Sequence, residues 1–210
     1  IMRIMGIDEA GRGCVLGDLV ISAFVVESPC DVALREAGAD DSKKLSKKRR
    51  AAAREALGAL GAPDVRRVTP AQIDAGNLNQ LEEATIVDLI RHWRPAHVFI
   101  DALGHPKTLP ALERRLRAQL PADLQVELTI EPKADGTYPV VGAASIFAKT
   151  TRDDALTAID AEHGPLGSGY PSDPKTRRWL QAHAATGAPW PDFVRTRWQT
   201  VQDLAQAALL

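Results

Sequence analysis

The chain alternates short apolar runs with longer segments in which apolar residues recur every three or four positions. The short runs, rich in Val, Ile, Leu and Phe, predict strands over residues 3–8, 19–27, 65–68, 97–101 and 124–130. The longer segments predict helices over 46–60, from 70 onward, and over 78–93, 106–120, 140–163, 174–185 and 193–209. Ser46 is a candidate N-cap for the first of these helices.

The order of these elements indicates the fold class. A glycine-rich turn between the first two strands suggests a hairpin, and the later strands alternate with helices. This order favours an α/β fold with a mixed sheet and helices on both of its faces. The helix over 140–163 begins with the small residues Gly142, Ala143, Ala144 and Ser145, which permit close approach to a neighbouring backbone.

Composition then narrows the class of protein. The 210 residues, 45% of them hydrophobic, suit one domain or one domain with a small appendage. The formal net charge is -1, so a global basic signature is missing and any binding of nucleic acid must depend on local charge. Two cysteines, Cys14 and Cys30, argue against a disulfide-built secreted domain, and no apolar run has membrane-spanning length. We therefore expect a cytoplasmic protein.

Two acids and a glycine-rich turn follow the first predicted strand. Asp8 and Glu9 end the apolar run, and Gly11-Arg12-Gly13 comes two residues later. Acids at the end of a buried strand are costly to desolvate unless a cation pairs with them. Glycine in the turn lets the backbone approach a ligand closely. A metal beside a phosphate explains the combination, and a strand end with solvated acids before an ordinary turn is the simpler alternative.

Further acids follow other predicted strands. Asp101 ends the strand over 97–101, and Asp135 comes soon after the strand over 124–130. If these strands are parallel neighbours, the acids Asp8, Glu9, Asp101 and Asp135 reach one edge of the sheet. Carboxylate oxygens suit Mg²⁺ or Mn²⁺, whereas the five histidines lack the spacing of zinc ligands. A single strand-end aspartate is more often a turn former, so the argument depends on their co-location.

Several blocks of the chain together resemble ribonuclease HII, a type 2 ribonuclease H, and its archaeal and eukaryotic branch in particular. They are Gly6-Ile7-Asp8-Glu9-Ala10-Gly11-Arg12-Gly13, Asp41-Ser42-Lys43-Lys44-Leu45-Ser46, Lys133-Ala134-Asp135, Ala143-Ala144-Ser145-Ile146-Phe147-Ala148-Lys149, Thr151-Arg152-Asp153, and the run from Gly167 to Thr176. The blocks keep the family's order from Gly6 to about Trp198.

The resemblance implies a fold and an activity. The fold would be RNase H-like, with a mixed five-stranded sheet, a catalytic domain over 1–165 and a helical extension over 166–210 packed on it. The activity would be metal-dependent hydrolysis of RNA in RNA–DNA hybrids and incision 5′ of ribonucleotides embedded in duplex DNA. The products would carry a 3′-hydroxyl and a 5′-phosphate. The enzyme would act as a monomer with Mg²⁺ or Mn²⁺, using two ions during catalysis.

The resemblance also assigns roles to residues. The catalytic and metal-binding acids would be Asp8, Glu9, Asp101 and Asp135. The backbone of Gly11, Arg12 and Gly13 would recognise the ribose 2′-hydroxyl, Tyr170 would stack on the sugar at the RNA–DNA junction, and Lys43, Ser145 and Lys149 would contact phosphates. Without the resemblance, Tyr170 could be a loop aromatic packed on the core, and Ser145 and Lys149 could be a cap and a surface lysine.

Two positions depart from the family pattern. Cys14 and Asp18 stand where the family usually has proline, so the turn loses a rigid φ and gains a negative charge. The basic run over 47–50 suits a solvated helix face as well as a phosphate contact.

Two other functions stay open. A different RNase H-like nuclease would share the acids without needing the 2′-hydroxyl. A non-catalytic hybrid-binding module would keep the fold, although all four acids are present.

Overall fold

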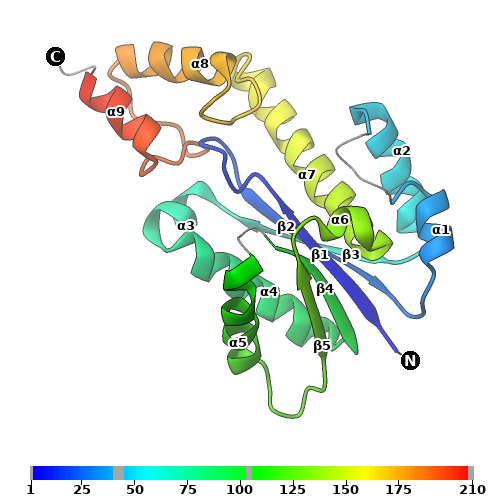
Figure 1. Ribbon diagram of the computed structural model, residues 1–210. Coiled ribbons are helices and arrows are strands. Elements are labelled where there is room, and N and C mark those ends of the chain that lie inside the picture. Colours follow the sequence, from blue (N-terminus) through cyan, green and yellow to red (C-terminus); the bar gives the residue numbers. More distant parts are fainter. Residues whose placement is uncertain (1, 40–44, 103–105, 208–210) are drawn as a thin grey trace. The chain divides into compact units, whose positions relative to one another are not determined.

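The computed structural model describes residues 2–39, 45–102 and 106–207. Its strands form one five-stranded sheet in the order β3-β2-β1-β4-β5 (Figure 1). They are β1 Ile4–Ala10, β2 Leu19–Val26, β3 Ala62–Val68, β4 His97–Asp101 and β5 Glu127–Glu131. β1, β4 and β5 run parallel, with Ile7 of β1 opposite Ile100 of β4. The predicted α/β fold with a mixed five-stranded sheet is confirmed.

Helices follow the predicted segments closely, with three exceptions: two short helices that were not predicted and the start of the last helix. The helices are α1 Asp31–Glu36, α2 Lys47–Gly58, α3 Pro70–Ala75, α4 Leu78–Trp93, α5 Leu109–Gln119, α6 Ala134–Thr137, α7 Pro139–His163, α8 Pro174–Ala185 and α9 Gln199–Ala207, and a 3₁₀ turn covers Pro106–Thr108. Ser46 caps α2 as predicted, because its hydroxyl accepts a hydrogen bond from the N–H of Arg49 at 3.3 Å. The short helices α1 and α6 were not predicted, since six and four residues carry too little periodicity.

The start of the last helix differs from the prediction. We predicted a helix from residue 193, but α9 begins at Gln199. The residues before it form turns around one bridge, because Val194 pairs antiparallel with Leu16 and the N–H of Arg195 donates to the carbonyl of Val15 at 2.9 Å. Pairing with a segment far away in the sequence has overridden the local helical pattern here.

The chain forms two compact units. Unit 1 contains Ile1–Ala10, Ile21–Arg66 and Glu82–Thr150, and unit 2 contains Gly11–Val20, Arg67–Leu81 and Thr151–Leu210. This division follows contacts within the chain. The boundary at residue 165, which we expected between a catalytic domain and a C-terminal extension, stays a prediction.

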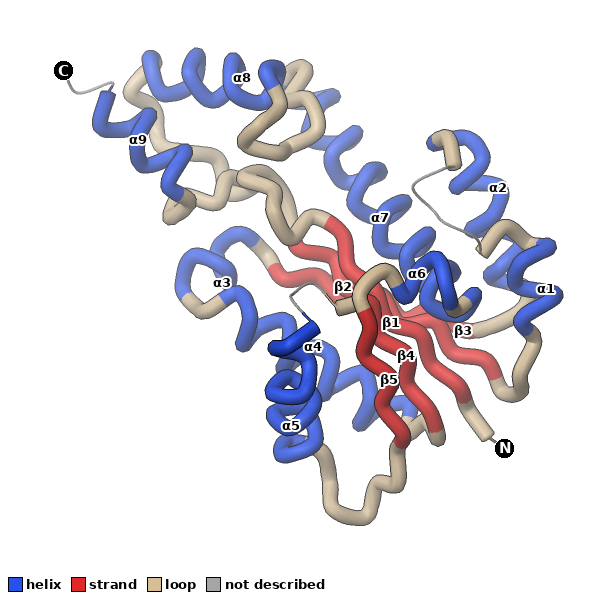
Figure 2. The backbone as a smooth tube through the Cα atoms, viewed as in Figure 1, coloured by secondary structure: helices blue, strands red, loops and turns tan. Residues whose placement is uncertain are grey.

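In unit 1, helices cover both faces of the sheet. Figure 2 shows α4 and α5 on one face and α1, α2 and the first half of α7 on the other. The second face is closed by a buried cluster that joins Phe24 and Val26 of β2 to Leu57 of α2 and to residues 140–147 of α7. Gly6 of β1 has the backbone of Val140 against it, since a Cβ atom there would come within 2.3 Å of the Val140 carbonyl. Of the small residues predicted to permit a close approach, Gly142 does so, since a Cβ atom there would come within 2.4 Å of the Ala39 carbonyl oxygen.

Unit 2 has a separate apolar cluster. Its buried members include Leu16 and Val15 from the glycine-rich segment, Leu180 from α8, and Val194 and Val201 from the C-terminal residues. Trp179, Trp190 and Trp198 pack against this cluster. The N-terminal turn and the C-terminal segment therefore share one core.

Candidate metal centre and recognition turn

The topology of unit 1 brings two acids to one end of neighbouring strands. Ile7 and Ile100 are paired across the parallel strands β1 and β4, and Asp8 and Asp101 follow them directly. Parallel strands present their carboxyl ends at the same edge of the sheet. The strand ends thus place both acids together, as the sequence predicted.

A sharp turn brings in the third acid. After β5, Lys133 adopts a left-handed conformation with φ 61° and leads into the one-turn helix α6. Asp135 lies in this first turn and is buried. Asp8, Asp101 and Asp135 each offer a ligand atom such that all of these atoms lie within 4.8 Å of one another. Among the described residues, this is the group of acids that could hold a metal ion.

Glu9 takes a different position from its neighbour. It lies on β1 next to Asp8, and successive side chains of a strand point to opposite faces of the sheet. It is half-buried and is not a member of the group within 4.8 Å. Its backbone contributes to the centre instead, because its N–H donates a 2.8 Å hydrogen bond to Oδ1 of Asp8.

One face of α7 surrounds the acids with polar groups. Gly6 and Asp8 are two residues apart on β1 and share a face, and α7 packs against Gly6. Lys149 of α7 donates to the hydroxyl of Ser145 at 2.9 Å, and its Nζ lies 3.9 Å from Oδ2 of Asp135. Both residues were expected to contact phosphates. The structure places them beside the acids, with Ser145 buried and Lys149 half-buried.

Burial and crowding change the acidity of Asp8. Its side chain is only 5% exposed, and burial, with Asp101 as a second carboxylate nearby, raises the pKa of Asp8 to about 7. The hydroxyl of Ser145, the ammonium of Lys149 and the N–H of Glu9 act in the opposite direction without cancelling this effect. The site therefore holds negative charge poorly unless a cation enters it.

The donor set fits a divalent metal ion. Three carboxylates within ligand distance of one another offer hard oxygen atoms, which suit Mg²⁺ and Mn²⁺. A divalent ion would offset the cost of burying Asp8 and Asp135 as anions. Chemically, such a centre can bind and polarise a phosphate ester and a water molecule.

The glycine-rich turn lies in unit 2 and is tightly bounded. Gly11 has φ +85°, and a Cβ atom there would come within 2.8 Å of the Asp18 carbonyl. Any residue with a side chain would be strained at this position. Arg12 is half-buried and donates to the side-chain oxygen of Asn79. Gly13 is exposed, and its Cα faces the ring of Tyr170, since a Cβ would lie 3.4 Å from Cε1 of that ring.

Arg152 connects the turn with the loop that carries Tyr170. Its guanidinium donates to Sγ of Cys14 at 3.1 Å and to the carbonyl of Ser168. It also lies over the Tyr170 ring, 5.3 Å from its centroid. Tyr170 is 40% exposed, so one part of the ring packs against the loop and another part faces solvent. That is the arrangement a stacking residue needs.

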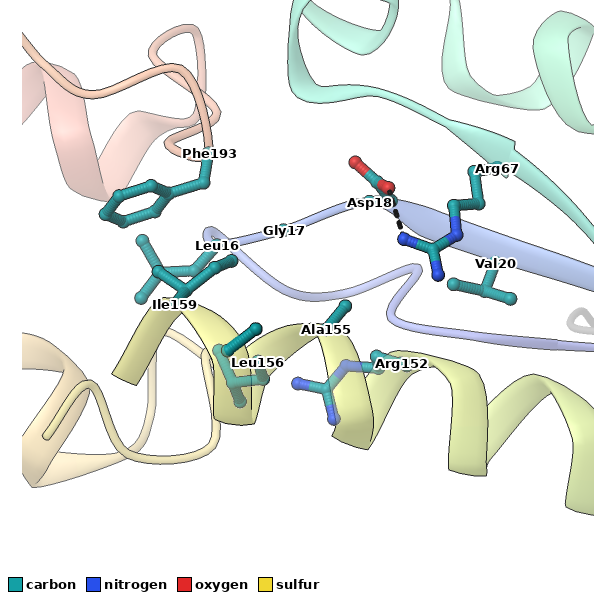
Figure 3. Close-up of a pocket in the computed structure, with 11 residues that line it drawn as sticks. Leu16, Gly17, Asp18, Val20, Arg67, Arg152, Ala155, Leu156, Ile159 and Phe193 are labelled. Carbon is teal, nitrogen blue, oxygen red and sulfur yellow. Dashed lines mark ion pairs between the residues drawn. The ribbon is translucent and has the colours of Figure 1, made fainter. Parts of the chain in front are cut away.

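Asp18, the second departure from the family pattern, has an ionic partner. Its carboxylate lies 3.7 Å from the guanidinium of Arg67, and burial raises its pKa. Figure 3 shows this ion pair at a pocket of about 270 Å³, where Leu16, Ile159 and Phe193 point toward one another. These walls are mostly apolar, so the pocket suits neither a phosphate nor a metal ion.

Comparisons with known proteins decide between the open families. The family model described as ribonuclease HII matches residues 5–201. The chain belongs to the ribonuclease HII family. It is 38% identical to ribonuclease HII of Thermococcus kodakarensis over 98% of this chain and 90% of that one. The crystal structure of the ribonuclease H2 from Pyrococcus horikoshii aligns with a TM-score of 0.89 and 34% identity over 99% of both chains. The Archaeoglobus fulgidus enzyme, solved in a complex with PCNA, aligns at a TM-score of 0.84 and 35% identity over 96% of both chains.

Family membership establishes the general activity. Ribonuclease HII enzymes are hydrolases, and the chain is an endoribonuclease of this family, which acts on RNA–DNA hybrids. In the described part of the chain, no helix is long and apolar enough to cross a membrane. The expectations of a monomer and of a cytoplasmic location stay predictions.

The structure separates the predicted site residues into groups. It brings together Asp8, Asp101 and Asp135, with Ser145 and Lys149 beside them. In unit 2, it places Tyr170 against Gly13. Lys43 lies outside the described residues. Lys47, Lys48 and Arg49 are exposed on α2, as a solvated helix face would be.

Sequence reasoning missed the two arginines that hold the turn. Arg152 was noted only as part of a family block, and no role was expected for Arg195. Arg195 is in fact fully buried. The available signal was its position in the run Phe193-Val194-Arg195, where a charged residue follows two apolar ones that belong to the core.

Proposed function

We propose that this chain hydrolyses the RNA strand of RNA–DNA hybrids and incises duplex DNA on the 5′ side of embedded ribonucleotides. The products carry a 3′-hydroxyl and a 5′-phosphate, and the reaction requires Mg²⁺ or Mn²⁺. The observation that carries the proposal is the group of three carboxylates within 4.8 Å, in a chain whose family acts on RNA–DNA hybrids.

The acids would hold the metal ions. Asp8, Asp101 and Asp135 would supply the ligand oxygens, and the assignment of Glu9 as a fourth ligand rests on the family resemblance. Two bound ions would supply activation of a water molecule and stabilisation of the leaving 3′-oxygen. Ser145 holds Asp8 by a hydrogen bond, and Lys149 offsets negative charge at Asp135. Both side chains also suit contact with a phosphate oxygen of the substrate.

Recognition of the ribonucleotide belongs to the turn and to Tyr170. The backbone of Gly11, Arg12 and Gly13 hydrogen-bonds the 2′-hydroxyl, the group that distinguishes RNA from DNA. The ring of Tyr170 stacks on the neighbouring deoxyribose at the RNA–DNA junction. Support comes from the exposed Gly13, from the exposed part of the Tyr170 ring, and from the packing of the two against each other.

A cleavage assay with matched duplexes tests the proposal. The substrate is duplex DNA with one ribonucleotide, and the control is the same duplex with deoxyribose at that position. We expect incision only of the first duplex, 5′ to the ribonucleotide, with Mg²⁺ or Mn²⁺ and not with EDTA. The Asp101→Asn variant serves as the control for a contaminating nuclease and is expected to be inactive.

Three results would contradict the proposal. Cleavage of the all-DNA duplex or of DNA junctions at the same rate would indicate a different RNase H-like nuclease. Tight binding of the hybrid without cleavage by the wild-type protein would indicate a binding module. Unchanged cleavage by Asp101→Asn or Asp135→Asn would show that these acids are not the catalytic ligands.

A further inference from the structure

Arg195 makes an unusual set of contacts for an arginine. Its side chain is 0% exposed, and its guanidinium donates three hydrogen bonds to backbone carbonyls. The acceptors are Gly11 at 2.7 Å, Arg12 at 2.9 Å and Gly17 at 3.0 Å. Two of the three carbonyls thus belong to the recognition turn itself.

These bonds fix the direction of two peptide planes. In a trans peptide, the C=O and the N–H of the same unit point in opposite directions. The carbonyl of Gly11 shares its plane with the N–H of Arg12, and the carbonyl of Arg12 shares its plane with the N–H of Gly13. Because Arg195 draws both carbonyls toward its buried guanidinium, both N–H groups are directed away from it.

Only an arginine can supply this pattern. The guanidinium is a planar fork with five N–H donors, whereas the lysine ammonium is a single point with three rotatable donors. Arg195 is also held in place itself. Its own N–H donates to the carbonyl of Val15 at 2.9 Å, and its guanidinium carbon lies 5.4 Å from the ring centroid of Trp198. Burial lowers the pKa of Arg195 to about 10, so the group stays charged at neutral pH.

We propose that Arg195 is a positioning residue for substrate selectivity: it orients the N–H groups of Arg12 and Gly13 so that the turn prefers a 2′-hydroxyl to a 2′-hydrogen. This inference rests on the proposed function of the turn. It assigns to the C-terminal segment an indirect part in recognising ribose, carried by one buried side chain that acts through the backbone of the turn.

Binding measurements on paired duplexes test the role of Arg195. All proteins carry Asp101→Asn so that neither duplex is cut, and each is titrated with duplex DNA that contains one ribonucleotide or its deoxy counterpart. The readout is the ratio of the two Kd values. We expect Arg195→Lys to lower this ratio by about tenfold, the effect of about one lost hydrogen bond, with the Kd for all-DNA duplex nearly unchanged. Arg178→Lys, an exposed conservative change on α8, is the matched control and should leave the ratio intact.

A second variant covers the case in which Arg195→Lys does not fold. Trp198→Leu removes the ring beside the guanidinium and leaves the three carbonyl bonds possible, so we expect a smaller fall of the same ratio. Circular dichroism and thermal unfolding establish that each variant is folded.

The outcomes separate this inference from the proposed function. A parent protein that prefers ribose, together with variants that keep the full ratio or weaken both Kd values in proportion, would overturn the role of Arg195 alone. A parent protein that binds both duplexes equally would overturn the proposed function and this inference together.

Discussion

The replacement Asp8→Asn should abolish cleavage and, at the same time, make the metal-free protein more stable. Asp8 is buried beside Asp101, and its pKa is raised to about 7 from 3.8. A carboxyl group with a raised pKa in the folded state destabilises the fold at every pH where it is ionised. Asparagine has nearly the same volume, keeps an oxygen that can accept the N–H of Glu9, and carries no charge.

The size of the effect follows from the shift. About three pKa units at about 1.4 kcal/mol each set an upper limit of about 4 kcal/mol at pH 8. The destabilisation by Asp8 develops over the pH range between its pKa in the unfolded chain, 3.8, and its pKa in the folded protein, about 7. The penalty of Asp8 is small at pH 4, grows as pH rises, and is complete above pH 7. The amide of asparagine is itself a buried polar group that keeps part of the desolvation cost, so we expect a net gain of about 2 kcal/mol at pH 8.

Urea unfolding of both proteins in EDTA, at several values between pH 4 and pH 8, measures this difference. We expect the two free energies of unfolding to agree within about 1 kcal/mol at pH 4 and to diverge as pH rises, with Asp8→Asn the more stable. Titrating groups that do not interact with Asp8 are shared by the two proteins and cancel in the comparison. Saturating Mg²⁺ should then stabilise the wild type by about 2 to 3 kcal/mol and the variant by much less.

Two results would refute this reasoning. If Asp8→Asn were less stable than the wild type in EDTA at pH 8, the ionised carboxylate would be well solvated or well paired without a metal. If the difference did not depend on pH, the change in stability would come from packing rather than from charge. The same titration on Asp123→Asn is a control of opposite sign, because Asp123 is exposed and its ion pair with Arg94 lowers its pKa.

Three further changes test separate parts of the structure. Tyr170→Ala should reduce cleavage of a single embedded ribonucleotide at least about tenfold more than cleavage of a long hybrid, since the single ribonucleotide offers only one junction for stacking. Tyr170→Phe, which keeps the ring, is the control. Equal losses on both substrates would argue against the stacking role. Cys14→Pro should have a lower free energy of unfolding in urea than Cys14→Ala, because proline removes the N–H that donates to the Gly11 carbonyl at 3.2 Å. A higher free energy of unfolding for Cys14→Pro would contradict this prediction. Gly6→Ala should lower the free energy of unfolding by about 3 kcal/mol, because its Cβ would overlap the Val140 backbone, and a neutral effect would show that α7 can move away from β1.

The acids could be predicted from the sequence because strand ends are local features. An apolar run that finishes in a carboxylate is visible in the chain, and parallel pairing then brings two such ends together. Asp135 could be predicted because it follows the strand over 124–130 by only a few residues. The position of Glu9 relative to the other acids was harder to predict. Asp8 lies on the face toward the other acids, and strand alternation places the neighbouring Glu9 on the opposite face of β1.

What the sequence could not predict depends on contacts between distant segments. Residues 193–195 look helical by composition but pair with Val15–Gly17, so α9 begins later. The same pairing buries Arg195 under the turn, a position that its charge alone would not predict. Charge and hydropathy along the chain describe a residue's own preference, whereas these positions are set by their partners.

The demand for a metal ion arises from packing as much as from the acids themselves. Gly6 lets α7 approach β1 so closely that a methyl group would not fit, and Asp8 shares that face two residues later. The approach removes water from Asp8, and burial is the largest cause of its raised pKa. Four acids on a looser sheet would be solvated anions with little need of a cation. Gly6 therefore contributes to the metal centre through packing, because the close approach it permits buries the negative charge that a divalent ion would offset.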